Sequence, residues 1–274
     1  MRIRGWIGYT LYGIAITVFF LFFLFPSGLF KSYLESAAMK YINAGVTIDS
    51  SSLIFPSTVS LKNCKIHFNG RTHAPVIIDA MKVVPSIKNL LKGKAAVRIE
   101  GSAYGGSIKA RMIMRNRFSL SGPVTFTGDF QNIDIGKCDW IQKAFGRRLE
   151  GNFKGTGDFE GVTGGLLDGS GRFEGTLFNG NIELIENILG FDTVAFDRIE
   201  AKGDLQTRTL KVNSLTMIGN DMNAELNGNI YLDGSAERTR IALKGFIHVP
   251  ALNRKIPLSV GGTMAGPAIN IRKN

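Results

Sequence analysis

Strict alternation of apolar and polar residues marks four segments of this chain. In 118–130 every even position is apolar or Gly, and every odd position is polar or Pro. The same period of two runs through 149–161, 224–232 and 239–249. Because successive side chains of a strand point to opposite faces, the pattern predicts half-buried strands with one wet face and one dry face.

Ten further segments have a strand-like composition and end in turn residues such as Asn69-Gly70 and Gly105-Gly106. Few long helices separate them, so they predict an antiparallel meander of about fourteen strands. An open sheet of that size usually curls or splits, and its dry face needs cover. Inward-facing Gly residues favour sharp bending, so we expect a trough, with a sandwich-like closure as the alternative. The ten segments are 46–55, 58–68, 76–84, 95–103, 107–114, 171–178, 194–205, 210–218, 258–264 and 268–271.

Four short segments have helical rather than alternating spacing. In 32–43 the apolar residues share one face, and Gly45 follows as a stop signal. The segments 86–92, 134–145 and 182–189 show the same spacing on a smaller scale. The predicted fold class is therefore mainly β, with a few short helices that plug an end of the sheet or cover part of its dry face.

Twenty consecutive residues without a charge, 6–25, precede all of these elements. As a helix this run would span about 30 Å, the thickness of the hydrocarbon layer of a bilayer. Arg2 and Arg4 lie before it, so its N-terminus should stay cytoplasmic and the rest should be exported. The run is too long for a signal peptide and has no cleavage site close behind it, which predicts an uncleaved single-pass anchor. Its aromatic residues are Trp6, Tyr9, Tyr12, Phe19, Phe20, Phe22, Phe23 and Phe25.

This organisation divides the chain into three parts: a cytoplasmic tip and anchor at 1–26, a helical connector at 27–45, and a β-rich exported domain at 46–274. The chain carries a net charge of +11, of which +9 lies beyond the anchor. A basic surface suits nucleic acid or anionic phospholipid. Export and the scattering of Lys and Arg along strands exclude nucleic acid, so membrane lipids are the expected partner.

Candidate chemistry is sparse. The three His residues lack the spacing of metal ligands, and Gly155-Thr-Gly157 lies in a strand rather than before a helix, unlike a dinucleotide-binding motif. No nucleophile, base and orienting group come together, so we expect neither an enzyme nor a cofactor. In an oxidising compartment Cys64 and Cys138 could form a disulfide; two buried free thiols are the equal alternative.

The apolar stripe itself is the strongest functional signal. In one interpretation the stripe is a hydrophobic groove that holds acyl chains or an apolar partner. In the other it is an ordinary β core sealed by its own side chains, and periodicity alone favours this second interpretation. The candidate groove residues are Phe118, Leu120, Val124, Phe126, Phe130, Leu149, Phe153, Phe159, Leu226, Ile230, Ile241, Leu243 and Ile247.

A series of short motifs follows the anchor in a recognisable order. Over essentially its full length the chain resembles the type II secretion system protein N family. Its closing Gly-Thr-x-x-x-Pro strand also resembles AsmA-like envelope proteins, whose strands form lipid-conducting troughs. The motifs are Gly45-Val46-Thr47-Ile48, Leu53-Ile54-Phe55-Pro56, Ala74-Pro75-Val76-Ile77-Ile78-Asp79, Pro85-Ser86-Ile87 with Leu90-Leu91-Lys92-Gly93-Lys94, Ala103-Tyr104-Gly105-Gly106-Ser107-Ile108 and Leu258-Ser259-Val260-Gly261-Gly262-Thr263-Met264-Ala265-Gly266-Pro267.

This resemblance implies a bacterial inner-membrane protein with a periplasmic β domain, no catalytic residues, and other secretion-system subunits as partners. The first hypothesis is therefore a non-enzymatic accessory of type II secretion. The second is a lipid-binding or lipid-transfer protein that shields acyl chains in a hydrophobic β-groove.

Overall fold

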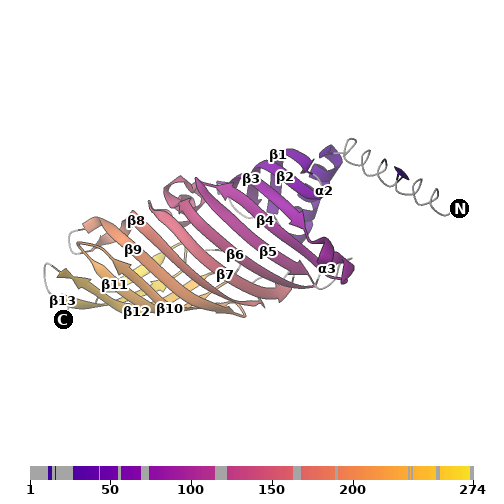
Figure 1. Cartoon of the computed structure of the whole chain (residues 1–274). Coiled ribbons are helices and arrows are strands. Elements are labelled where there is room, and N and C mark those ends of the chain that lie inside the picture. Colours follow the sequence, from indigo (N-terminus) through magenta and orange to yellow (C-terminus); the bar gives the residue numbers. More distant parts are fainter. Residues whose placement is uncertain are drawn as a thin grey trace, which may run out of the picture.

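A single antiparallel sheet dominates the computed structural model of this chain (Figure 1). All fourteen strands follow one another in the sheet in the order of the sequence. Each strand therefore pairs only with its neighbours along the chain, which is the predicted meander. The structure describes residues 12, 13, 16, 27–42, 44–54, 57–68, 74–114, 122–162, 168–188, 191–233, 235, 237–250 and 254–271.

The fourteen predicted strands are confirmed in number and approximate position. Their bounds are β1 Ala44–Ile54, β2 Thr58–Phe68, β3 Val76–Pro85, β4 Ala95–Ala103, β5 Gly106–Met114, β6 Pro123–Asp134, β7 Asn152–Val162, β8 Ser170–Ile188, β9 Phe191–Gln206, β10 Thr209–Ile218, β11 Asn223–Tyr231, β12 Arg240–Val249, β13 Arg254–Gly262 and β14 Pro267–Ile271.

Three of the four predicted helical segments are helical. The connector is α2, Ser27–Ile42, which begins five residues before the predicted start. The segment 86–92 contains α3, Ile87–Leu91. The segment 134–145 contains the 3-10 turn η1, Ile135–Lys137, and then α4, Asp139–Phe145, which Gly146 ends in the left-handed conformation.

The helix predicted for 182–189 is wrong, because residues up to Ile188 continue strand β8. The spacing of Ile182 and Ile185 fits a helix, but Ile182 and Leu184 also fit the period of a strand. Ile182 pairs with Val194 of β9 and also bridges to Leu149, so pairing on both sides favours the extended conformation.

The apolar face lies on the inside of the curve of the sheet. Near the C-terminus the sheet bends far enough for β14 to contact β8. Inward residues of β8 to β14 pack there around buried Val194 and Ile247. The sheet therefore covers its own dry face at this end, although its strands form one sheet rather than the two of a sandwich.

The opposite end of the sheet is covered by α2. Buried Ile48, Leu61 and Cys64 form a cluster on β1 and β2, and Leu34 of α2 packs against it. The backbone N–H of Ile48 donates a hydrogen bond to Glu35 of α2 over 3.3 Å. This helix thus closes the end of the apolar face that lies nearest the N-terminus.

Most of the anchor predicted for 1–26 falls outside the described residues. Of its aromatic residues only Tyr12 is described, and its side chain is exposed. Among the described residues, none of the helices combines the length and apolar character that crossing a bilayer requires.

Candidate functional site

Apolar side chains form continuous rows that cross the sheet at right angles to the strands. In the central row every strand contributes a residue that is apolar or Gly, and each residue is the register partner of the next. At about 4.8 Å per strand the row is roughly 60 Å long. From β1 to β14 it contains Leu53, Val59, Val83, Ile99, Ala110, Gly128, Gly157, Phe173, Gly203, Val212, Gly228, Leu243, Val260 and Ile269.

A second row runs parallel to the central one on the side of the β9–β10 turn. It is also free of polar side chains, so the apolar face is at least two residues wide along most of the sheet. From β3 to β12 it contains Pro85, Val97, Met112, Phe126, Phe159, Gly171, Leu205, Leu210, Ile230 and Ile241.

Phe rings lie over Gly residues on this face. A Cβ built on Gly155 would be 2.5 Å from the Cζ atom of Phe153, and one on Gly203 would be 2.5 Å from Cε1 of Phe173. The ring of Phe159 occupies the corresponding space at Gly169. Since the rings fill the positions of the missing side chains, they lie low against the backbone and give this part of the sheet a flat aromatic surface.

One margin of the apolar face is covered by α4. Trp140 and Ile141 of this helix pack into a cluster with Phe130 and Phe153, whose ring centroids are 6.4 Å apart. Buried Ile135 belongs to the same cluster. This margin is therefore an ordinary hydrophobic core.

The row that contains Phe126 and Phe159 has no such cover. Among the described residues the main contacts of β4 to β7 are with sequential neighbours, and the rest of the sheet curls over only from β8 onwards. Phe126, Phe159 and Phe173 remain half-buried rather than buried. Side chains of this size in a sealed core would be excluded from water, so these three rings are partly accessible, and we call the part of the face around them the open part.

The candidate groove residues thus fall into distinct environments. Phe126 and Phe159 lie on the open part, whereas Phe130, Leu149 and Phe153 pack under α4. Leu226 and Ile247 belong to the C-terminal cluster, and Val124 and Leu243 are buried. Ile230 and Ile241 continue the row of Phe126 on β11 and β12. Phe118 and Leu120 lie outside the described residues.

Several residues of the open face were absent from the sequence-based set. Phe173, Met112 and Ile99 are inward-facing and half-buried. A Gly-x-Phe-x-Gly pattern, Gly171 to Gly175, marks Phe173 in the sequence as it does Phe153 and Phe159 elsewhere, and it could have indicated this position.

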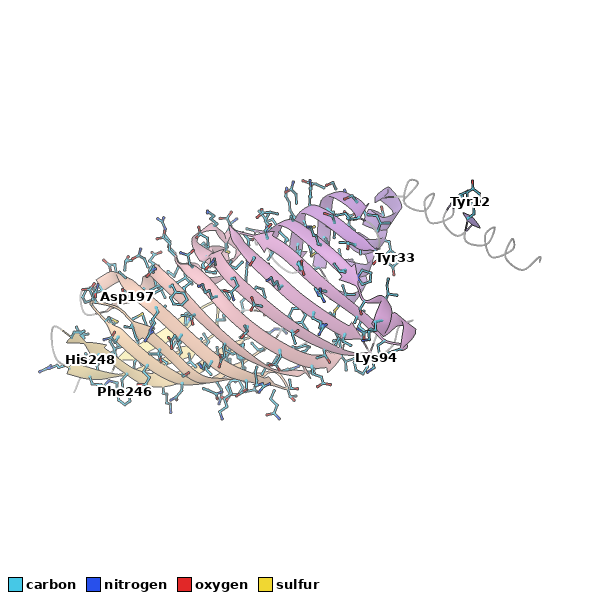
Figure 2. All side chains as sticks on the ribbon, viewed as in Figure 1. Tyr12, Tyr33, Lys94, Asp197, Phe246 and His248 are labelled. Carbon is cyan, nitrogen blue, oxygen red and sulfur yellow. The ribbon has the colours of Figure 1, made fainter. Side chains whose placement is uncertain are left out.

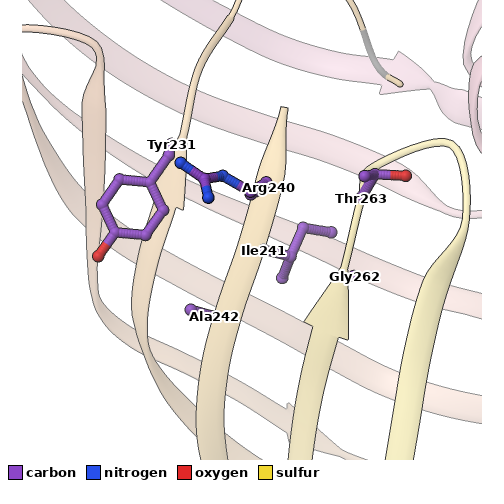
Figure 3. Close-up of a pocket in the computed structure, with 6 residues that line it drawn as sticks. All are labelled: Tyr231, Arg240, Ile241, Ala242, Gly262 and Thr263. Atoms are coloured by element: carbon purple, nitrogen blue, oxygen red, sulfur yellow. The ribbon is translucent and has the colours of Figure 1, made fainter. Parts of the chain in front are cut away.

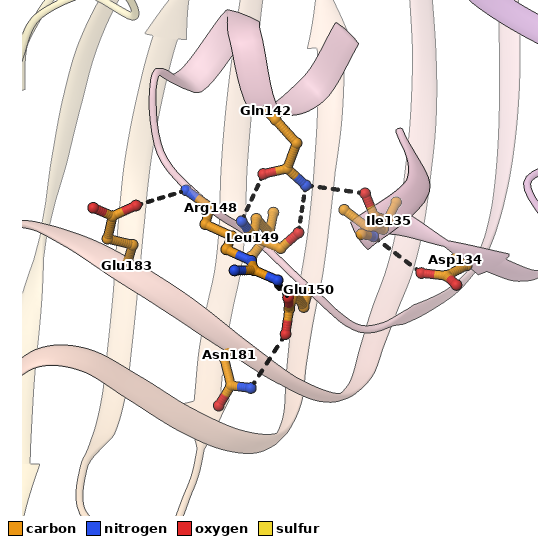
Figure 4. A network of polar contacts seen from close by, with 9 residues as sticks. Asp134, Ile135, Gln142, Arg148, Leu149, Glu150, Asn181 and Glu183 are labelled. Carbon is orange, nitrogen blue, oxygen red and sulfur yellow. Dashed lines mark hydrogen bonds and ion pairs between the residues drawn. The ribbon is translucent and has the colours of Figure 1, made fainter. Parts of the chain in front are cut away.

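The helix α4 is fixed to the sheet by one amide side chain (Figure 4). Gln142 donates hydrogen bonds from Nε2 to the carbonyl oxygens of Ile135 and Leu149, over 3.1 and 2.6 Å. Its Oε1 accepts from the N–H of Leu149 over 2.8 Å. Next to it, Arg148 contacts Glu150 over 2.7 Å. The Gln142 hydrogen bonds join α4 to η1 before it and to the segment that leads into β7 after it.

The two cysteines are free, so the disulfide considered from the sequence is not formed. Cys64 packs in the cluster under α2 and Cys138 in the cluster under α4, which are separate parts of the sheet. Burial, and then the charges of Asp134 and Asp139, raise the pKa of Cys138 to about 12. Both thiols are therefore protonated at neutral pH.

Two adjoining pockets lie at the ends of β11 to β13. The larger has a volume of about 530 Å³ and is lined by Tyr231, Arg240 and Thr263 among others (Figure 3). The Arg240 guanidinium lies 5.9 Å from the centre of the Tyr231 ring. In the register these two residues face each other on the polar side, so the pocket is a surface depression outside the open apolar face.

Among the described residues, no three His, Cys, Asp or Glu side chains lie where they could hold a metal ion. Charges on the polar face of β7 to β9 pair across strands, as in Arg172–Asp158 over 3.4 Å and Lys202–Glu174 over 3.1 Å. The hydrogen bond from Arg208 lowers the pKa of Asp168, and both side chains are about half exposed. The open apolar face is the site that remains.

Comparison with known proteins identifies no relative from which the role of this site could be inferred. The chain matches no protein-family model, no curated protein and no solved structure.

Proposed function

We propose that the open apolar face binds acyl chains of membrane lipids. The observation that carries the proposal is the unbroken pair of apolar rows, in which the row through Phe126 and Phe159 has no covering element on β5 to β7 among the described residues. A large exposed apolar surface on a folded protein marks an interaction site. The groove that the sequence predicts is, in this proposal, a trough that runs across the strands.

The dimensions of the rows suit lipid. One leaflet of a bilayer contributes about half of a hydrocarbon thickness of about 30 Å, so one acyl chain would span about three strands. The Phe rings lie against the Gly residues beneath them, and the surface that they form offers no hydrogen-bonding group. Such a surface binds chains by burial alone, which fits a carrier that accepts different acyl chains.

A matched set of four positions on β6 and β7 tests the proposal. Phe126 and Phe159 are register partners on the apolar face, and Thr127 and Asp158 are register partners on the polar face. We would place a photoreactive phenylalanine analogue at each position in turn, irradiate cells, and search the purified protein for lipid adducts. Adducts at the first pair alone support the proposal. Equal adducts at both pairs, or none, contradict it.

The predicted location belongs to the same proposal: a single-pass anchor in a bacterial inner membrane, with the sheet in the periplasm. It is supported by the uncharged run 6–25 and by Arg2 and Arg4 before it. Protease added to spheroplasts should digest the sheet. Protection of the sheet in intact spheroplasts would contradict this orientation.

A role as an accessory of type II secretion is the second candidate. The observation in its favour is the free edge of β14, which has a partner on one side only among the described strands. Another protein could extend the sheet there by strand addition. Deleting the gene separates the two functions: a secretion accessory should lose export of folded cargo, whereas a lipid carrier should lose the permeability barrier of the outer membrane and keep export.

A further inference from the structure

The charge of the chain is concentrated at one end of the sheet. Residues 27–117 contain fourteen Lys and Arg against four Asp and Glu, a net charge of +10. Residues 118–274 contain 17 and 18 respectively, a net charge of −1. The first segment forms α2, β1 to β5 and α3, which we call the basic end.

Most of the described cations of the basic end are exposed and make no ion pair; Lys31, 3.9 Å from Glu35, is the exception. Nine of them are described as exposed, and none makes an ion pair in the part of the chain that the structure describes. On β7 to β9, in contrast, Arg172, Arg198 and Lys202 all have acidic partners. The nine are Lys62, Lys65, Lys82, Arg98, Lys109 and Arg111 on the polar face, and Lys88, Lys92 and Lys94 around α3.

Two of these cations face each other. Arg98 of β4 and Arg111 of β5 are direct register partners, and the next residue in that row, Thr127, is uncharged. Like charges in directly opposite positions destabilise a sheet. An external anion that binds between them would remove this repulsion, so the arrangement is typical of a surface that meets negative charge.

Exposed apolar side chains accompany the cations. Ile87, at the start of α3, is 55% exposed, and Tyr33 of α2 is 61% exposed. In Figure 2 Tyr33 and Lys94 lie at the same end of the molecule, the end at which the chain enters the sheet. Lysines around an exposed aliphatic residue, with an aromatic residue nearby, suit the headgroup region of a membrane.

We infer that the basic end docks on a bilayer that contains anionic phospholipid. The uncharged run 6–25 ends one residue before α2 begins, so insertion of that run would hold this end, and no other part of the sheet, next to a bilayer surface. The opposite end carries almost no net charge and would point away. Docking does not depend on acyl-chain binding, but it would bring the open apolar face to the lipid.

Lysine labelling of the full chain in lipid nanodiscs tests the inference, with lysines of the far half as internal controls. Nanodiscs would contain phosphatidylcholine alone or mixed with phosphatidylglycerol. With the anionic lipid, acetylation of Lys88, Lys92 and Lys94 should slow at least about threefold relative to Lys211 and Lys244. High salt should abolish the difference, because it screens the attraction.

Charge-reversal variants distinguish docking through the basic end from non-specific adsorption of the whole chain to the bilayer. Lys88→Glu with Lys92→Glu and Lys94→Glu should remove the protection of Lys62, whereas Lys211→Glu with Lys244→Glu should leave it intact. Equal labelling of the α3 lysines in both kinds of nanodisc would overturn the inference. Equal protection of Lys211 and Lys244 would overturn it too, since the whole chain would then adsorb without a preferred end.

Discussion

Replacing Phe126 with Asp tests whether the apolar face is open, because the new charge should have different effects on the empty protein and on the lipid-bound protein. Phe126 is half-buried, belongs to none of the three buried clusters and pairs with Phe159. In the empty protein an aspartate at this position reaches water. Under a bound acyl chain the same carboxylate would lie against hydrocarbon.

The expected loss of folding stability is therefore smaller than the expected loss of lipid-binding free energy. Full burial of a Phe side chain stabilises a fold by about 1.5–3 kcal/mol, so loss of the half-buried ring should cost about 1 kcal/mol. For a chain of this size that lowers the melting temperature by roughly 2–4 °C and leaves the protein folded. An unpaired charge held against an acyl chain costs at least about 3 kcal/mol, which reduces bound lipid about a hundredfold.

The assay is quantification of copurified phospholipid by native mass spectrometry, together with circular dichroism of the same sample. Thr127→Asp is the control, because Thr127 is the exposed neighbour on the polar face, where the new charge would lie in water between Arg111 on one side and Asp158 on the other. We expect folded F126D without lipid and folded T127D with lipid. Unchanged lipid in F126D would refute acyl-chain binding at this position, and complete unfolding of F126D alone would show a sealed core.

Four further outcomes follow from contacts already described. Gln142→Ala removes three hydrogen bonds and should lower the free energy of unfolding by about 2 kcal/mol in urea titrations; a loss below about 0.5 kcal/mol would show that α4 is held by packing alone. Because the pKa of Cys138 is raised from 9.0 to about 12, its alkylation at pH 8 should be about a thousandfold slower in the folded than in the unfolded chain. The unfolded thiol ionises first, so stability should fall as the pH rises from 9 to 12, and Cys138→Ala should flatten that decline. Gly203→Val should destabilise the sheet by about 1–3 kcal/mol, and Phe173→Ala should recover only part of this, because the added side chain also meets the carbonyl of Lys211; additive effects in this double-mutant cycle would mean that ring and Gly do not interact.

Period-two patterning was enough to predict the strands because one face of every hairpin is apolar. In β7 the predicted alternation holds from Phe153 to Gly161, and only the first residues differ. Leu149 lies before the strand and bridges to Ile182 instead. The failure at Ile182 has a related cause: its conformation depends on pairing with Val194 and Leu149, which local spacing does not contain.

The candidate site was predictable in part. Inward residues such as Phe126 follow from alternation, but which Gly lies under which ring depends on the register between strands. That register shifts at irregularities between Phe130 and Ile133 and between Val212 and Ser214, which no local pattern marks. Whether a residue is open or covered depends on where α4 and the C-terminal strands lie, as Phe126 and Phe153 show.

Because every strand pairs only with the strands before and after it in sequence, the sheet is modular. A hairpin could be duplicated or lost without rethreading the chain, and each gain would lengthen the molecule by about 10 Å. The near-repeat of Gly155–Gly161 at Gly169–Gly175 lies on the adjacent strands β7 and β8, so its unit is a single strand with its turn rather than a hairpin. The number of hairpins therefore sets the length of the sheet. That length can change without altering α2 at one end or the curled C-terminal strands at the other.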